Sequence, residues 1–99
     1  MEGQMKLKAT VELWQKGKWC IARIPDLDFV AQGPTAEEAK KNLIEVINIQ
    51  FAEMREMGTL EDYLAECGFI IKDGDAEPEN EIIGFERQVL QIGNSSVYA

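Results

Sequence analysis

Catalysis at neutral pH usually requires a poised acid or base, and this chain offers few residues that could serve. It has no histidine, and Cys20 and Cys67 lie far apart in the sequence, outside any CxxC pair. Asp26 and Asp28 flank an expected turn and could bind a divalent ion such as Mg²⁺, although turn carboxylates more commonly accept hydrogen bonds from the local backbone. We therefore predict no catalytic residue, metal site or cofactor, and expect that the protein is not an enzyme.

Two other sequence patterns resemble the start of a calcium site and of a phosphate site, but each lacks residues that such a site requires. The acidic run from Asp73 starts like an EF-hand calcium loop, but its sixth position is Pro78 where glycine is required, and its twelfth is Gly84 where glutamate is required. A Gly-Pro-Thr break precedes the main predicted helix, yet Glu37 and Glu38 in the first helical turn would repel a phosphate. No calcium or nucleotide site is predicted.

The net charge of the chain indicates which kind of macromolecule it could bind. Eighteen acidic and ten basic residues give a net charge of −8, which opposes direct binding to nucleic acid because phosphate contacts need clustered Lys and Arg. An acidic protein suits a basic protein partner, although acidity can equally serve solubility alone. The chain lacks a signal peptide at residues 1–4 and any apolar run long enough to cross a membrane, so a cytoplasmic location is expected.

Ninety-nine residues with 45% hydrophobic composition predict one folded domain over residues 1–99. Its first part should form an antiparallel sheet whose three strands cover residues 5–14, 19–24 and 29–32. A polar break containing Gly17 joins the first two strands, so Trp14 and Trp19 are expected to face each other across it. Pro25 cannot donate to a ladder and should end the second strand.

A long helix is predicted from Ala36 to Met57, because Thr35 and Glu38 match a capping box. Its apolar residues recur at spacings of three and four and form a stripe that can cover one sheet face: Ala39, Leu43, Val46, Ile47, Phe51 and Met54. Ile44 and Ile49 lie off this stripe. The helix should overhang the sheet and meet either a short second helix or a second copy of the protein, and these two residues are the candidate oligomer contacts.

In the last third of the sequence, the residue pattern predicts a short helix over residues 59–67, a solvated acidic loop over 72–81 and a final strand over 81–92. Gly84 in that strand is expected to mark a bulge, and residues 93–99 a frayed tail. The element order is therefore β-β-β-α-α-β in a single α+β domain, with the long helix packed on one face of the sheet.

Two segments together resemble the core signature of the HicB-like antitoxin family. They are Trp19–Leu27, a strand ending in Pro-Asp-Leu, and Gln32–Ala39, a helix start, and the later 58–69 stretch is similar to endings seen in that family. The resemblance implies a partial ribonuclease-H-like fold without the ribonuclease active site. It departs from the family at Asp28–Val30, where Pro-Gly and a small residue are common, and no segment resembles a helix-turn-helix or ribbon-helix-helix.

The resemblance also implies an antitoxin that binds and blocks a small basic RNA-cleaving toxin of the HicA type. With the negative charge, it gives the first hypothesis: a non-catalytic protein that covers the toxin's RNA surface. The expected contacts are Asp26, Asp28 and the acidic stretch after residue 72, chiefly Asp73, Asp75, Glu77 and Glu79. The alternative is a stand-alone protein of structural or regulatory role, which self-associates as a homo-oligomer and has no toxin partner.

Overall fold

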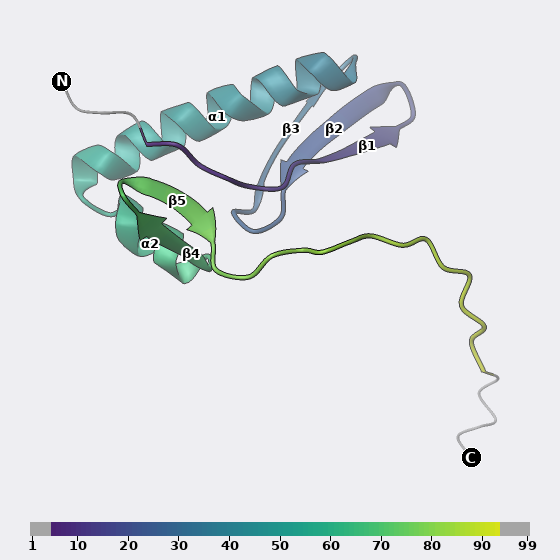
Figure 1. Ribbon diagram of the computed structural model, residues 1–99. Coiled ribbons are helices and arrows are strands. Elements are labelled where there is room, and N and C mark those ends of the chain that lie inside the picture. The colour runs from purple at the N-terminus through teal and green to yellow at the C-terminus, as the bar shows by residue number, and fades with distance from the viewer. Residues whose placement is uncertain (1–4, 94–99) are drawn as a thin grey trace.

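The computed structural model describes residues 5–93 of the chain (Figure 1). Its elements in chain order are β1 (Glu12–Lys16), β2 (Trp19–Ile24), β3 (Phe29–Gly33), α1 (Ala36–Met57), α2 (Leu60–Glu66), β4 (Phe69–Lys72) and β5 (Asp75–Pro78). This order confirms the predicted α+β class, with three antiparallel strands, a long helix, a short helix and a return to β structure. The predicted frayed tail falls mainly on residues 94–99, which lie outside the described residues, as do residues 1–4.

The three-stranded sheet has the order β1-β2-β3, and both strand pairs are antiparallel. β2 ends at Ile24, directly before Pro25, as predicted. The expected pairing of Trp14 with Trp19 is wrong, because Trp14 lies opposite Ile21 and Trp19 lies opposite Lys16. The turn is tighter than the four-residue break expected from the sequence, and this shifts the register so that the two tryptophans are diagonal neighbours on one face.

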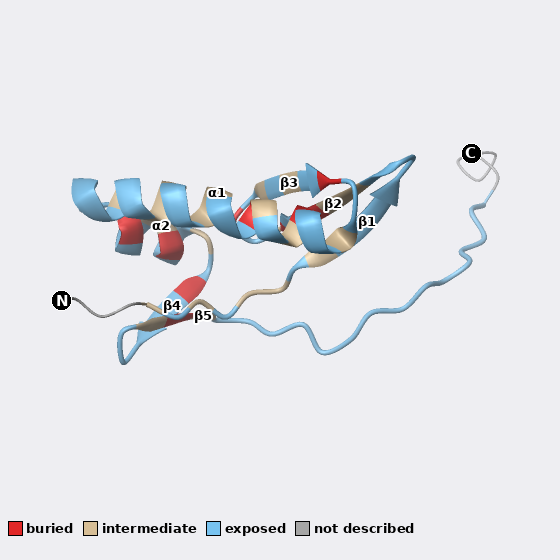
Figure 2. Ribbon diagram, turned by 90° about the horizontal axis from the view of Figure 1, so that it is seen from above, coloured by how far each residue is buried: buried red, intermediate tan, exposed pale blue. Residues whose placement is uncertain are grey.

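Helix α1 confirms both predicted ends. The Thr35 hydroxyl oxygen accepts a hydrogen bond of 3.1 Å from the Glu38 amide, and Gly58 ends the helix in a left-handed conformation at φ 75°. The helix lies along one face of the sheet, and its residues Ala39 and Leu43 are buried against it (Figures 1 and 2). No helix among residues 5–93 combines the length and the apolar character needed to cross a membrane.

The segment predicted as an acidic loop forms a β-hairpin instead, because β4 and β5 pair antiparallel across Asp73 and Gly74. Both turn residues have positive φ, at 55° and 83°, as in the two-residue turns that match the twist of paired strands. β5 also lies parallel to the start of the chain: the Lys8 amide donates to the Ala76 carbonyl, and the Ala76 amide donates to the Lys6 carbonyl, both at 2.9 Å. The β4–β5 hairpin therefore joins the last strand of the domain to the start of the chain.

The first predicted strand is shorter than expected. Residues 5–11 form an isolated parallel bridge between Leu7 and Ala76, and regular strand structure starts only at Glu12. The alternation is still present in this segment, since Met5, Leu7 and Ala9 pack against the core while the lysines between them are exposed. Residues 5–11 therefore contact β5 through this one bridge, and pairing with β2 starts at Glu12.

The predicted final strand over residues 81–92 is wrong. Residues 79–93, which we name the C-terminal arm, have no helix or strand, and every residue in the arm is exposed. Figures 1 and 2 show the arm leaving the folded body beyond β5. Strand structure requires a partner for the backbone amides and carbonyls, and beyond the bond from the Glu79 amide to the Gly68 carbonyl the described residues give the arm no backbone hydrogen bond.

Candidate functional site

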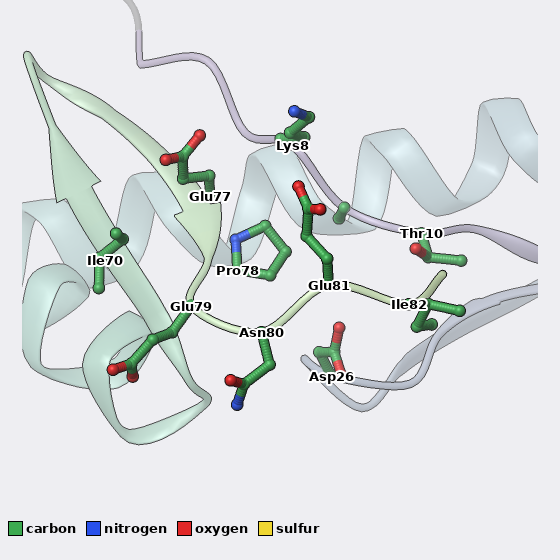
Figure 3. Close-up of a pocket in the computed structure, with 11 residues that line it drawn as sticks. Lys8, Thr10, Asp26, Ile70, Glu77, Pro78, Glu79, Asn80, Glu81 and Ile82 are labelled. Carbon is green, nitrogen blue, oxygen red and sulfur yellow. The ribbon is translucent and has the colours of Figure 1, made fainter. Parts of the chain in front are cut away.

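An open groove of about 720 Å³ lies at the junction of three segments (Figure 3). These segments are the stretch before β1, the β2–β3 turn, and the chain that leaves β5. The groove is lined by Lys8, Ala9, Thr10, Asp26, Ile70, Glu77, Pro78, Glu79, Asn80, Glu81 and Ile82. Four of these residues are acidic and one is basic, so we name the site the acidic groove.

The β2–β3 turn places Asp26 on one side of the acidic groove. The next residue, Leu27, is 1% exposed and fixes the turn to the core, while the Leu27 and Asp28 amides both donate to the Ile24 carbonyl. From α2, the Tyr63 hydroxyl donates a hydrogen bond of 2.7 Å to the Leu27 carbonyl. A buried side chain and a hydrogen bond from a second element therefore hold the position of Asp26.

The other acidic residues come from β5 and the start of the arm. Glu77 lies opposite Ile70 in the β4–β5 ladder, and its carboxylate is 3.7 Å from the Lys72 ammonium. The Glu79 amide donates to the Gly68 carbonyl at 2.8 Å, which fixes the backbone at the end of β5. In Figure 3, Glu81 lies between Lys8 and Asp26, on the chain that crosses the groove.

This arrangement creates a negative surface beside exposed apolar side chains. The carboxylates of Asp26, Glu79 and Glu81 have no ion-pair partner among the described residues, and Glu77 has only the long contact to Lys72. An open site of this kind repels phosphate and attracts Lys and Arg side chains. Ile70 and Ile82 add apolar contact area for the stems of such side chains.

Three of the six residues predicted to contact a partner lie together in the acidic groove. Asp26, Glu77 and Glu79 line the acidic groove, as does Glu81 at the end of the predicted acidic stretch. The predicted contacts outside the groove are Asp28 in the β2–β3 turn, Asp73 in the hairpin turn and Asp75, whose carboxylate accepts a hydrogen bond of 3.0 Å from the Lys6 amide.

Other lining residues were not predicted from the sequence. Lys8, Asn80 and Ile82 reach the groove because β5 lies beside residues 6–8, and no local pattern indicates that pairing. On α1, the candidate oligomer contacts Ile44 and Ile49 are exposed, at 56% and 60%. The last turns of α1 pack on α2, which was one of the two alternatives for the overhanging helix, and the oligomer contact through Ile44 and Ile49 stays a prediction.

No family model, curated protein or solved structure matches this chain. Within residues 5–93, no cluster of three or more cysteine or acidic side chains has a geometry that could hold a metal ion. The described acidic groove offers carboxylates, one ammonium group, a side-chain amide, a hydroxyl and apolar surface. Its most direct chemical capability is the reversible binding of a cationic surface.

Tyr63 provides a test of how the groove is supported. Burial raises the pKa of Tyr63 from 10.0 to about 12, and a hydrogen bond with Cys67, the Cys67 charge and the Asp28 charge act in the same direction. Below pH 10 the phenol is protonated in both the folded and the unfolded state. Between pH 10 and 12 only the unfolded state loses the proton, so the contribution of Tyr63 to stability falls as pH rises through this window.

The Tyr63→Phe variant is therefore expected to lose about 1 kcal/mol of unfolding free energy at neutral pH, because the hydrogen bond to Leu27 is lost. The difference between wild type and variant should narrow as the pH rises from 10 to 12. Urea unfolding followed by circular dichroism at neutral and alkaline pH measures both effects. A difference that stays constant across this range would contradict the proton linkage.

Proposed function

We propose that the protein is a non-catalytic binding protein of the HicB-like antitoxin type, which neutralises a small basic RNA-cleaving toxin of the HicA type. The observation that carries this proposal is the acidic groove, with four carboxylates and one lysine around an open hollow. A protein that binds RNA presents Lys and Arg to phosphates. A surface of carboxylates competes for the same side chains and can thereby block access to RNA.

The position of the resembling residues also supports this proposal. The Pro-Asp-Leu segment that follows β2, part of the HicB-like signature, lies at the edge of the acidic groove: Asp26 lines the groove and the buried Leu27 holds the turn in place. The net charge of −8 would accelerate encounter with a basic protein. A cytoplasmic site of action fits the free thiols of Cys20 and Cys67, since cytosolic thiols remain reduced.

The test is co-expression with the product of the gene adjacent to this chain's own gene, which the proposal expects to be a small basic protein, followed by co-purification and an RNA-cleavage assay. A groove variant carries Asp26→Lys, Glu79→Lys and Glu81→Lys. Each replacement adds two charge units, so the three raise the net charge from −8 to −2. We expect the groove variant to bind at least about tenfold more weakly and to lose inhibition of cleavage, because attraction at the contact becomes repulsion.

The matched control changes the charge equally on the exposed surface of α1, with Glu45→Lys, Glu53→Lys and Glu56→Lys. This control should bind within about twofold of wild type at physiological salt, because the three side chains do not line the groove and salt screens exposed charges outside the contact. Equal weakening by both variants would indicate attraction by net charge alone and refute the groove as the contact. Absence of any complex with the wild-type chain would refute the toxin partner.

A stand-alone self-associating protein is the second candidate function, and one observation favours it. The C-terminal arm exposes large apolar side chains that no described residue covers. Residues 79–82 of the arm line the acidic groove, whereas the other large apolar side chains of the arm lie outside it.

A further inference from the structure

The C-terminal arm is unusually apolar for an exposed segment. Its large apolar side chains are at least half exposed, and those of Ile83 and Val89 are fully exposed: Ile82, Ile83, Phe85, Val89, Leu90 and Ile92. Apolar clusters of this size on a monomer mark an interaction surface. Ile83 and Phe85 alternate along the chain, as do Leu90 and Ile92, and this spacing is typical of a strand.

The accessible surface of the chain is larger than that of a compact monomer of the same length. The accessible surface is 8010 Å², whereas a compact monomer of this length exposes about 5,700 Å². The radius of gyration is 17.7 Å, against about 13 Å for a compact domain of this length. The excess area is larger than the roughly 800 Å² per partner that a standard protein interface buries. A dimer that covers the arm would therefore reach the size of a stable interface.

A matching acceptor lies on the sheet. Within the described residues β1 pairs only with β2, so its second edge is open. Apolar side chains are exposed on both faces of this edge, with Val11 and Leu13 on the α1 side and Trp14 on the other. An open edge with apolar residues on both faces accepts an added strand, which supplies backbone hydrogen bonds and side-chain contacts together.

A parallel neighbour lies beside the chain before β1 starts. Ala76 of β5 exchanges two hydrogen bonds of 2.9 Å with Lys6 and Lys8, and the residues that leave β5 line the acidic groove together with Lys8, Ala9 and Thr10. If the arm closed onto its own β1, it would remove water from the groove carboxylates, including Asp26 and Glu81, with one lysine to compensate. Burying several unpaired charges is costly, and this cost disfavours closure of the rest of the arm onto its own β1.

We propose that the C-terminal arm of one chain binds along the open edge of β1 in a second copy, and that the second copy's arm binds in return. The reciprocal exchange has two-fold symmetry, as closed dimers do. It covers the apolar side chains of both arms and both β1 edges. The acidic groove of each copy stays open to solvent, and the exchange does not depend on the proposed toxin partner.

Light scattering of the full-length chain tests this proposal. The wild type should be a dimer at micromolar concentration, and the Phe85→Glu/Leu90→Glu variant a monomer, with dimerisation weakened by at least about tenfold. The matched control, Gln88→Glu/Gln91→Glu, adds the same charge at polar positions of the arm and should remain a dimer. A monomeric wild type, or a dimer that survives the apolar replacements, would overturn the proposal.

Crosslinking distinguishes exchange between copies from closure within one copy. Chains with Cys20→Ala and Cys67→Ala carry either Leu13→Cys or Phe85→Cys, and the two preparations are mixed and treated with a short bis-maleimide. We expect a covalent pair that contains one chain of each kind. A chain carrying both new cysteines that gives only an internally linked monomer would show that the arm folds onto its own β1, and would reject the exchange.

Discussion

Replacing Leu27 by alanine is expected to lower the free energy of unfolding by about 3 kcal/mol, because a buried side chain is removed and leaves a cavity. Leu27 is 1% exposed and is among the largest fully buried side chains of the described chain. It lies in the turn that carries Asp26 into the acidic groove, and its carbonyl accepts the hydrogen bond from Tyr63. The change should therefore destabilise the fold and loosen one side of the groove.

Urea unfolding measures the Leu27→Ala effect, with Val30→Ala in the adjoining strand as the control. Val30 is 59% exposed, so its truncation should cost less than about 1 kcal/mol. Binding of the co-expressed toxin at a temperature where Leu27→Ala remains folded reports on the groove separately. Equal losses of stability in the two variants would contradict the role of Leu27 as the anchor of the turn.

The Gly33→Ala variant is expected to lose about 2 kcal/mol of unfolding free energy, because the added methyl group has no space. A Cβ at Gly33 would lie 2.8 Å from both the Ala39 amide nitrogen and the Glu38 Cβ, and 3.0 Å from the Glu38 carbonyl carbon. Two of these atoms belong to the backbone of α1, so the helix would have to move away from β3. Thermal unfolding measures the loss.

Gly84→Ala is the matched control for this prediction. Gly84 lies in the C-terminal arm, and a Cβ there would have no neighbour within 4 Å. Its replacement should change stability by less than about 0.5 kcal/mol. A Gly33→Ala protein that unfolds at the same temperature as Gly84→Ala would show that α1 approaches β3 less closely than the structure indicates.

Helix α1 could be predicted from the sequence to the residue at both ends, because its signals are local. Thr35 accepts from an amide three residues away, Gly58 provides the left-handed stop, and the apolar stripe has helical spacing. The end of β2 was predictable for the same reason, since Pro25 acts on its own backbone. Caps and breakers act over a few residues and need no knowledge of tertiary contacts.

The β4–β5 hairpin was missed although a local signal was present. Asp73-Gly74 is a typical two-residue hairpin turn, but the acidic residues around it suggested a solvated loop. In the arm, the alternating apolar residues indicated a strand, and strand structure depends on a partner that the sequence does not specify. The acidic groove was predictable only in part, because the contact between β5 and residues 6–8 brings its sides together.

The hydrogen bond from the Lys6 amide to Asp75 joins residues 69 positions apart, beside the backbone bonds of Ala76. Contacts between such distant residues form only after a large loss of chain entropy, and they slow folding. On the ribosome, the sheet of β1 to β3 and helix α1 can assemble as soon as they emerge. The Lys6 carbonyl and the Lys8 amide have no β5 partner until the β5 segment has been synthesised and released from the ribosome.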